Sequence, residues 1–133
     1  MNPTLRNILA VVAGTAVCLL LNALLLGLMM GLNPPPSGFD PNVLETYGLL
    51  GTRHLLNPFL AHALPSLIGG ALAALLAANN HRTMALVVGF VHLLGGIAAA
   101  FMIPAPAWFI AADVLLAYLP MAWLGWKLSR RPA

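Results

Sequence analysis

Six polar side chains lie inside otherwise apolar stretches of this sequence, where a polar group costs free energy unless it has a partner or a task. They are Asn22, His62, Ser66, His92, Asp113 and Tyr118. A histidine beside an aspartate can hold a proton, because an imidazolium favours the carboxylate whereas removal from water opposes it. We therefore predict that His62 and Asp113 form a proton- or ligand-binding couple that responds to external pH.

The depth of these residues follows from counting 1.5 Å per residue from the ends of the apolar runs. On that scale His62 and Asp113 fall roughly 6 and 9 Å below one boundary, and His92 falls near the middle. The opposite half of every run is nearly free of polar side chains. We therefore expect a pocket open to one side. The predicted ligand-binding residues are His62, Asp113, Asn22, Ser66, His92 and Tyr118.

The composition indicates what surrounds these residues. Of 133 residues, 61% are hydrophobic and 7% charged, whereas a soluble domain carries roughly 25% charged residues. Four apolar runs are each long enough to cross ~30 Å of hydrocarbon as a helix: residues 8–32, 58–78, 83–103 and 107–126. A barrel would need eight or more strands. The sequence predicts an all-α membrane protein, with residues 1–133 forming a single four-transmembrane-helix bundle.

The basic residues predict how the bundle is oriented. One side of the predicted membrane carries Arg6, Arg82, Lys127, Arg130 and Arg131, and the other carries only Arg53, beside two acidic residues. The positive-inside rule places both termini in the cytoplasm and the loop 33–57 outside. The same basic residues are predicted to contact membrane lipids. No basic stripe alternates with aromatic residues, so nucleic-acid binding is not expected.

The loop 33–57 contains signals of its own. Three prolines, Pro34 to Pro36, predict an extended exit from the first helix. Asp40 and Pro41 are expected to cap and begin a short amphipathic helix on the membrane surface. Its apolar residues recur at helical spacing at Val43, Leu44, Tyr47 and Leu50. Asn57 and Pro58 repeat the cap-and-proline pattern and are expected to begin the second span.

Small residues at helical spacing predict which helix faces meet. The second span carries His62, Ser66, Gly69, Ala73 and Ala77, and the third carries Ala85, Gly89, His92, Gly96 and Ala99. Such stripes let helices approach closely in lipid. Both histidines should therefore point into the bundle. Pro65 and Pro120 are expected to bend the second and fourth spans.

Several alternatives stay open for the polar residues. One alternative is purely structural: His62 and Asp113 would form an interhelical hydrogen bond, and Asn22 would hold helices together. A copper site would use thioether and imidazole ligands, here Met29, Met30, Met102, His54 and His62. Bis-histidine haem is disfavoured because His62 and His92 differ by roughly 10 Å in depth. A membrane enzyme acting on a lipid or quinone would use His62 and Asp113 as acid and base.

Two stretches resemble known sequences. They are Asn57 to Pro65 (NPFLAHALP) and Met102 to Gly125 (MIPAPAWFIAADVLLAYLPMAWLG), which look like small bacterial four-span membrane proteins known as uncharacterised hypothetical proteins. With the proline-rich exit after the first span, the resemblance covers most of the chain. It implies a bacterial inner membrane and four helices, and it transfers no functional residue.

These observations lead to a ranked prediction. The first is a small inner-membrane protein that binds, or helps to transport, a small ligand or a proton in an outward-facing intramembrane pocket. The second is an accessory subunit whose polar residues only pack helices. The third is a membrane enzyme or copper-binding protein; known catalytic motifs are absent from the sequence. The short chain also predicts a homo-oligomer or a partner membrane protein, and no cofactor is assigned.

Overall fold

The computed structural model describes residues 1–130, and no strand occurs in that range. The elements are α1 (Pro3–Leu32), the 3-10 helices η1 (Leu44–Leu49) and η2 (Thr52–Leu55), α2 (Leu56–Leu76), α3 (His81–Met102), α4 (Ala107–Leu116) and α5 (Leu119–Ser129). Four helical stretches are long and apolar enough to cross a membrane: Pro3–Leu32, Thr52–Leu76, His81–Met102 and Ala107–Ser129. The predicted all-helical chain with four such helices is confirmed.

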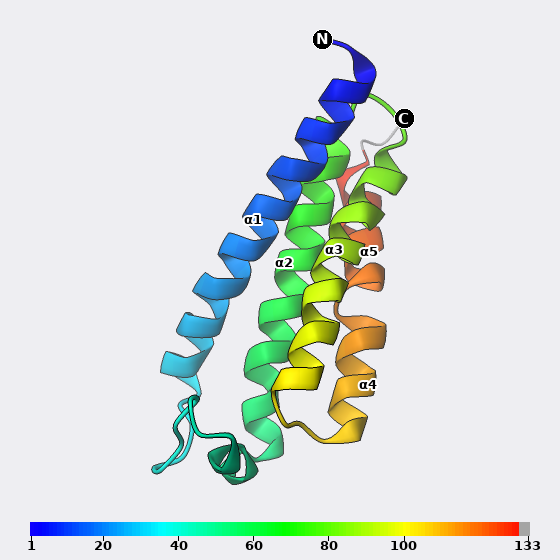
Figure 1. Ribbon diagram of the computed structural model, residues 1–133. Helices are drawn as coiled ribbons and strands as arrows, with labels where there is room; N and C mark the ends of the chain where they lie inside the picture. Colours follow the sequence, from blue (N-terminus) through cyan, green and yellow to red (C-terminus); the bar gives the residue numbers. More distant parts are fainter. Residues whose placement is uncertain (131–133) are drawn as a thin grey trace.

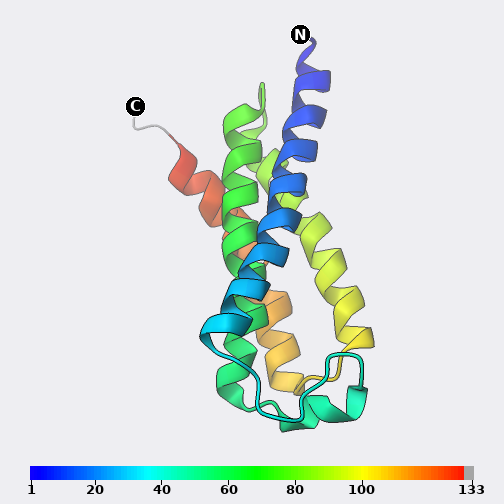
Figure 2. The ribbon, with the colours of Figure 1, turned by 90° about the vertical axis from the view of Figure 1, so that its left-hand side faces the viewer.

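The helices run side by side, so the molecule has two ends (Figures 1 and 2). The start of α1 and the finish of α5 lie at one end, which we call the terminal end. The segment 33–55 lies at the other, which we call the loop end. Of the basic residues predicted to share one side, those in the described range lie at the terminal end. Arg131 lies outside the described residues.

The terminal end is fastened by polar side chains of α1. Arg6 donates from Nε to the carbonyl of Leu76 at 2.8 Å, which satisfies a carbonyl at the C-terminus of α2. The Asn7 side chain accepts the backbone N–H of Ala78 at 2.8 Å. Between α2 and α3 the chain reverses within four residues, and Asn80 takes a left-handed conformation with φ 49°. Asparagine tolerates that conformation better than most residues.

Small residues bring α1, α2 and α3 together in the terminal half. Gly14 of α1 lies against Gly69 of α2, and a Cβ on Gly14 would come within 2.6 Å of the Gly69 carbonyl oxygen. Ala73 and Val88 fill the adjoining space and are completely buried. In lipid, close packing of this kind replaces the hydrophobic drive between helices. The predicted small-residue stripes therefore lie on the contacting faces of α2 and α3.

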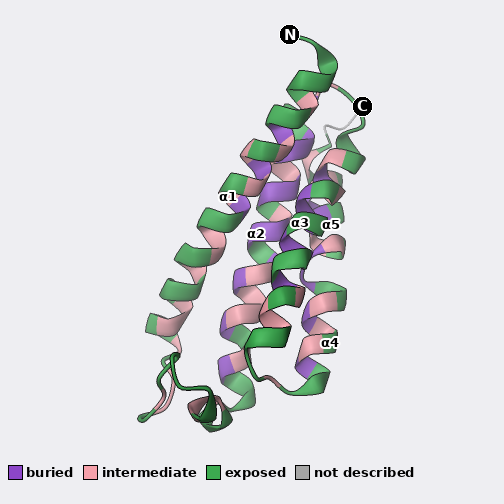
Figure 3. Cartoon of the chain, viewed as in Figure 1, coloured by how far each residue is buried: buried purple, intermediate pink, exposed green. Residues whose placement is uncertain are grey.

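The helices separate toward the loop end. The buried residues of α1 are Ala10, Gly14 and Cys18, and none lies beyond residue 18 of this 30-residue helix. Figure 1 shows α1 leaning away from α2 in this half, and Figure 3 shows exposed residues along its outer side. Leucines such as Leu20 and Leu24 are each 59% exposed there. Those side chains suit contact with lipid rather than water.

The loop differs from the sequence prediction in its helix type. Asp40 and Pro41 form a turn, in which the Asp40 carboxylate accepts the N–H of Asn42 at 2.9 Å, and the helix η1 begins only at Leu44. The Thr46 hydroxyl lies 2.7 Å from the carbonyls of both Asp40 and Val43. A threonine that bonds locally competes with the α-helical hydrogen bonds. The result is a short 3-10 helix.

The start of the second span differs from prediction, and the two prolines expected to bend helices behave differently from each other. α2 begins at Leu56, and Asn57 does not cap it. Instead the Asn57 amide donates to the carbonyl of Asn33 at 3.0 Å, which joins the loop-end termini of α1 and α2. Pro65 lies inside α2, which continues as one helix. The fourth span is interrupted between α4 and α5, because Pro120 has no N–H to donate to the carbonyl of Leu116.

Candidate functional site

Five of the six predicted polar residues meet at one place, midway along the bundle. His62 and Ser66 come from α2, His92 from α3, Asp113 from α4 and Tyr118 from the break before α5. Ser66, His92, Asp113 and Tyr118 are buried, with at most 5% of each residue exposed. The sixth, Asn22, is half-buried in α1, and its Oδ1 atom has no hydrogen-bond partner among the described residues. We call the first five residues together with Cys18 the polar cluster.

Asp113 is the centre of the first half of the cluster. Its two carboxylate oxygens lie 2.8 and 3.0 Å from Nδ1 of His62, and the hydroxyl of Tyr118 donates to Oδ2 at 3.0 Å. The His62 side chain is 19% exposed and the Asp113 side chain 7%. Because a carboxylate accepts, Nδ1 of His62 carries the hydrogen. The second ring nitrogen, Nε2, is then the atom of His62 that can accept a proton from another molecule.

The break between α4 and α5 positions the tyrosine. Tyr118 has φ −114° and ψ −82°, outside the helical range, and its side chain is completely buried. Its ring stacks on His62, with centroids 5.4 Å apart, and meets His92 edge-on at 5.0 Å. On α3 the ring lies against Gly96, where any Cβ would collide with it. Gly96 is therefore required by this arrangement.

The second half of the cluster surrounds His92. Its Nδ1 atom lies 2.8 Å from the Ser66 hydroxyl and 3.1 Å from the Cys18 sulfur. The Ser66 hydroxyl donates to the carbonyl of His62 at 2.7 Å. With its one hydrogen used there, the serine accepts from Nδ1 of His92. The rings of His62 and His92 are 5.9 Å apart, so the two halves are in contact.

A cavity of about 170 Å³ lies on the loop-end side of His62 and Asp113. Its walls are mostly apolar and come from α1, α2, α3, α4 and the loop. The lining residues include Leu26, Tyr47, Leu50, Leu55, Pro58, His62, Gly96, Ala99, Ala100, Ile103, Phe109, Ile110, Asp113 and Val114. A concave apolar site with few polar groups is the usual form of a small-molecule site.

Only two of the predicted ligand-binding residues line this cavity, His62 and Asp113. Ser66, His92 and Tyr118 lie behind them in the cluster, and Asn22 belongs to neither group. Depth counting along the sequence could not distinguish the wall of a cavity from the packing behind it.

Sequence reasoning missed two contributions to the site. Cys18 contacts His92, yet a lone cysteine in an apolar run carries no pairing signal. Tyr47 and Leu50 cover the cavity from the loop, although their helical spacing favoured a helix on the membrane surface. The signal available for the loop residues was their apolar character in a segment otherwise rich in polar and turn residues.

The geometry also bears on the two metal alternatives. Among residues 1–130, no three His, Cys, Asp or Glu side chains are grouped for a metal ion. For copper, Nδ1 of His54 accepts the N–H of Gly51 at 2.9 Å. The ring hydrogen is then on Nε2, so neither nitrogen of His54 has a free lone pair for a metal. For haem, the histidine rings are closer than the depth difference predicted, but Tyr118 packs against both of them.

Comparison of the chain with protein-family models, with curated proteins and with solved structures finds no match. The case for function therefore depends on the polar cluster and the cavity.

Proposed function

We propose that the chain is a multi-pass protein of the bacterial inner membrane, folded as a four-transmembrane-helix bundle with its terminal end in the cytoplasm. The support is the distribution of charge. Arg6, Arg82 and Lys127 lie at the terminal end, whereas the loop end has Arg53 in the company of two acidic residues. Positive residues favour the cytoplasmic side. In this orientation the segment 33–55 is the outer loop, and the cavity faces outward.

Within that frame, the protein binds a small ligand in the cavity and exchanges a proton with it through His62. One observation carries this proposal: the cavity has apolar walls, and its polar floor is a histidine whose Nδ1 is held by a carboxylate. That carboxylate fixes the ring and leaves Nε2 to act on a bound molecule, an arrangement used by histidines that accept protons or bind ligands. The Tyr118 hydroxyl donates a hydrogen bond to the same carboxylate.

The dimensions of the cavity indicate the kind of ligand. At about 170 Å³ it is smaller than the 300–1,000 Å³ typical of pockets for drug-sized molecules. Its few polar atoms would satisfy one hydrogen-bonding group and would leave any further polar group unpaired, at a cost. The favoured ligand is therefore a compact, mainly apolar molecule with one hydroxyl, amine or other proton-exchanging group.

A pocket is favoured over a continuous pore. Between the polar cluster and the terminal end, the space among the helices is filled by small apolar residues. Those that are at most 3% exposed include Ala10, Ala73, Ala74, Ala77, Ala85, Val88 and Ala122. A path for an ion or a polar solute needs polar groups or water along its length. Transport by this chain would therefore require a second protein or a second copy to complete the path.

The test uses small phenols and alcohols as probe ligands. The full-length protein is purified in mild detergent, and its thermal stability is measured against probe concentration. The wild type should be stabilised, since a ligand that binds only the folded state raises Tm. Ala100→Phe fills the cavity and should abolish this shift. Ala98→Phe is the matched control, because Ala98 is exposed on the same helix and does not line the cavity.

Two further results decide the proposal. His62→Gln should also lose the probe-induced shift, measured against its own Tm without probe. If both phenylalanine variants respond to the probes as the wild type does, the cavity is not the binding site and the proposal fails. A small molecule that co-purifies with the wild type and with Ala98→Phe, but not with Ala100→Phe, would identify the natural ligand by mass spectrometry.

A second candidate function is that of an accessory subunit that contacts another membrane protein or a second copy of itself. The observation that favours it is the free face of α1. Gly27 and Gly31 are four residues apart and exposed, and a Cβ added at either would meet nothing within 4 Å. Glycines at this spacing allow transmembrane helices to pair closely. Loss of an oligomer in Gly27→Leu, detected by cross-linking in membranes, would support this candidate; an unchanged oligomer would count against it.

A further inference from the structure

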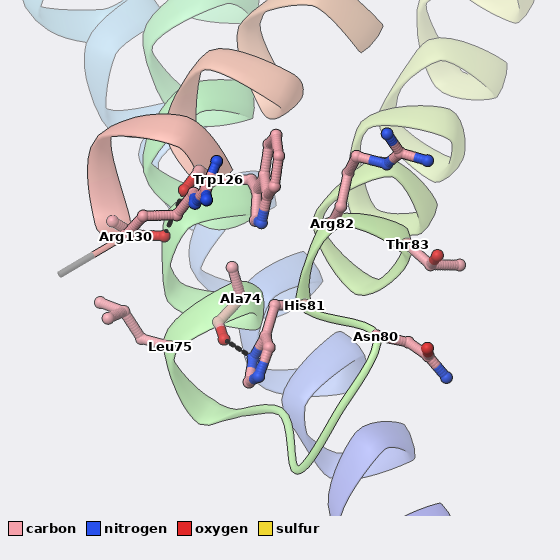
Figure 4. Close-up of a pocket in the computed structure, with 9 residues that line it drawn as sticks. Ala74, Leu75, Asn80, His81, Arg82, Thr83, Trp126 and Arg130 are labelled. Atoms are coloured by element: carbon pink, nitrogen blue, oxygen red, sulfur yellow. Dashed lines mark hydrogen bonds between the residues drawn. The ribbon is translucent and has the colours of Figure 1, made fainter. Parts of the chain in front are cut away.

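A second cavity lies at the terminal end, far from the polar cluster, and it is basic. Its volume is about 830 Å³. It lies between the end of α2, the start of α3 and the end of α5 (Figure 4). The residues that line it include Leu75, Asn80, His81, Arg82, Trp126 and Arg130.

Trp126 makes cation–π contacts with both arginines of this cavity. The guanidinium carbon of Arg82 lies 5.9 Å from the centre of the indole ring, and that of Arg130 lies 5.1 Å from it. Figure 4 shows the ring between the two side chains. A guanidinium near an aromatic face is attracted to it and still has N–H groups to donate. Two cationic forks are therefore held beside one hollow, although they come from different helices.

The start of α3 forms one edge of the cavity. His81 uses Nδ1 to donate to the carbonyl of Ala74 at 2.8 Å, which fixes the ring at that edge. Asn80, the N-cap residue, makes no side-chain hydrogen bond to the first turn of α3. The first backbone N–H groups of a helix have no carbonyl partner within it, and the positive end of the helix favours an anion.

No acidic side chain in the described range neutralises these cations. The chain has three carboxylate residues, Asp40, Glu45 and Asp113. Two are in the loop at the opposite end, and the third is paired with His62 in the polar cluster. Neither Arg82 nor Arg130 forms an ion pair within residues 1–130. The donors of this cavity are therefore available to an anion from outside the chain.

The cavity is apolar on one side. Leu75 lines it and is 55% exposed, at the end of a helix whose outer face is made of apolar side chains. Trp126 lies at the level where tryptophan commonly marks the membrane interface. A molecule in this cavity would contact cationic side chains at one of its ends and apolar side chains at the other.

We propose that this cavity binds the phosphate group of an anionic phospholipid, with Arg82 and Arg130 as its principal donors. A guanidinium group donates two parallel N–H bonds to a phosphate and carries the opposite charge, so each arginine favours a phosphate over a neutral polar headgroup. The adjoining apolar surface accommodates the start of the acyl chains, which favours a lipid over free phosphate. This site is separate from the loop-end cavity, so it depends on the membrane location of the chain but not on the proposed small ligand.

The test is a lipid titration of the full-length protein in detergent, followed by native mass spectrometry. Phosphatidylglycerol should bind the wild type more tightly than phosphatidylcholine. The double variant Arg82→Gln/Arg130→Gln should bind phosphatidylglycerol at least about tenfold more weakly, because charge-assisted hydrogen bonds are lost. Lys127→Gln is the matched control: Lys127 is a cation at the same end that lies over Trp123 and does not line the cavity. It should change the affinity by less than about twofold.

The other outcomes also decide the question. Equal losses in the double variant and in Lys127→Gln would show attraction by total charge alone and would overturn the site. Wild-type binding by the double variant would also overturn it. Inorganic phosphate is titrated in a separate arm, and displacement of the lipid by millimolar phosphate would assign the cavity to free phosphate instead. Trp126→Phe keeps an aromatic face and should give an intermediate loss; it replaces the double variant if that protein does not fold.

Discussion

The two halves of the helix bundle are built in opposite ways. In the terminal half, glycine and alanine bring α1, α2, α3 and α5 into close contact, and the buried side chains there are almost all apolar. In the loop half, α1 leans away and a cavity opens among α1, α2, α3 and α4. The polar cluster lies where the two halves meet.

This difference separates two tasks that a chain with four helices apolar enough to span a membrane must combine. Close packing of small residues holds the helices together, because lipid supplies no hydrophobic drive between them. An open half can then hold polar groups and a cavity without having to stabilise the assembly. The cluster is therefore reached from the loop end and closed off from the terminal end.

The largest effect is expected where two helix backbones touch. Gly14→Leu should prevent α1 from packing on α2, since even a Cβ at Gly14 would come within 2.6 Å of the Gly69 carbonyl oxygen. A cost of about 3 kcal/mol or more is expected from overpacking at backbone contact. Gly27→Leu is the matched control in the loop half of the same helix, where nothing lies within 4 Å. Unfolding of both variants in detergent by denaturant measures the difference.

The opposite result would break the comparison. If Gly27→Leu destabilised the protein as much as Gly14→Leu, the loop half of α1 would also be a packing surface. The accessory-subunit candidate would then gain support, because the contact would have to come from another chain.

The next largest effect concerns the pair at the floor of the cavity. Asp113→Ala should cost about 3 kcal/mol in the free energy of unfolding, because it leaves the buried donors of His62 and Tyr118 without their acceptor. In a His62→Ala background the same change should cost less, by about 1–2 kcal/mol. A double-mutant cycle measures this coupling. Additive losses would show that the two side chains do not depend on each other.

Much of the helical structure could be predicted from the sequence, because long apolar helices obey strong local rules. Four apolar runs of sufficient length gave four helices, and small residues at helical spacing gave the contacting faces of α2 and α3. His62 and Asp113 were paired by their similar depth and by the cost of an aspartate without a partner in an apolar segment. That estimate succeeds because a helix rises by a constant 1.5 Å per residue, so residue number converts directly into height.

The details that failed depend on tertiary contacts. Asn57 appeared to be a helix cap, but it bonds to Asn33, which lies 24 residues away. Predicted depths separated His62 from His92, yet their side chains incline toward each other and the rings meet. Asn22 was expected in the pocket, but α1 diverges where it lies. A lone sequence does not show how far a helix leans or which way a side chain extends.

Access to the two halves gives a third prediction. In a Cys18→Ala background, a cysteine at Ala100 should react with a small maleimide at least about ten times faster than one at Ala73, because exposure of the thiol controls reaction. Ala100 lines the loop-end cavity, whereas Ala73 is fully buried in the terminal half. Labelling rates followed by mass spectrometry provide the measurement. Equal rates would mean that the terminal half opens as readily as the loop half.

The smallest predicted effect separates buried from exposed hydrogen bonding by means of the two tyrosines in the sequence. Tyr118→Phe keeps the ring that stacks on His62 and removes only the hydroxyl that donates to Asp113 at 3.0 Å. The expected cost is about 1 kcal/mol, the usual net contribution of a hydrogen bond. Tyr47→Phe removes a hydroxyl that donates to the carbonyl of Pro41 at 3.2 Å in the exposed loop, and should cost less than about 0.5 kcal/mol.

The variants Tyr118→Phe and Tyr47→Phe also distinguish a ligand-binding role of Tyr118 from a purely structural one. If Tyr118 supports the Asp113 carboxylate that holds His62, Tyr118→Phe should weaken binding of the phenol probes as well as lower stability. Tyr47→Phe should leave the stability nearly unchanged and affect binding only through the cover of the cavity. A loss of stability in Tyr118→Phe with unaltered probe binding would mean that the hydroxyl only packs the break between α4 and α5. His62 would then be positioned by Asp113 alone.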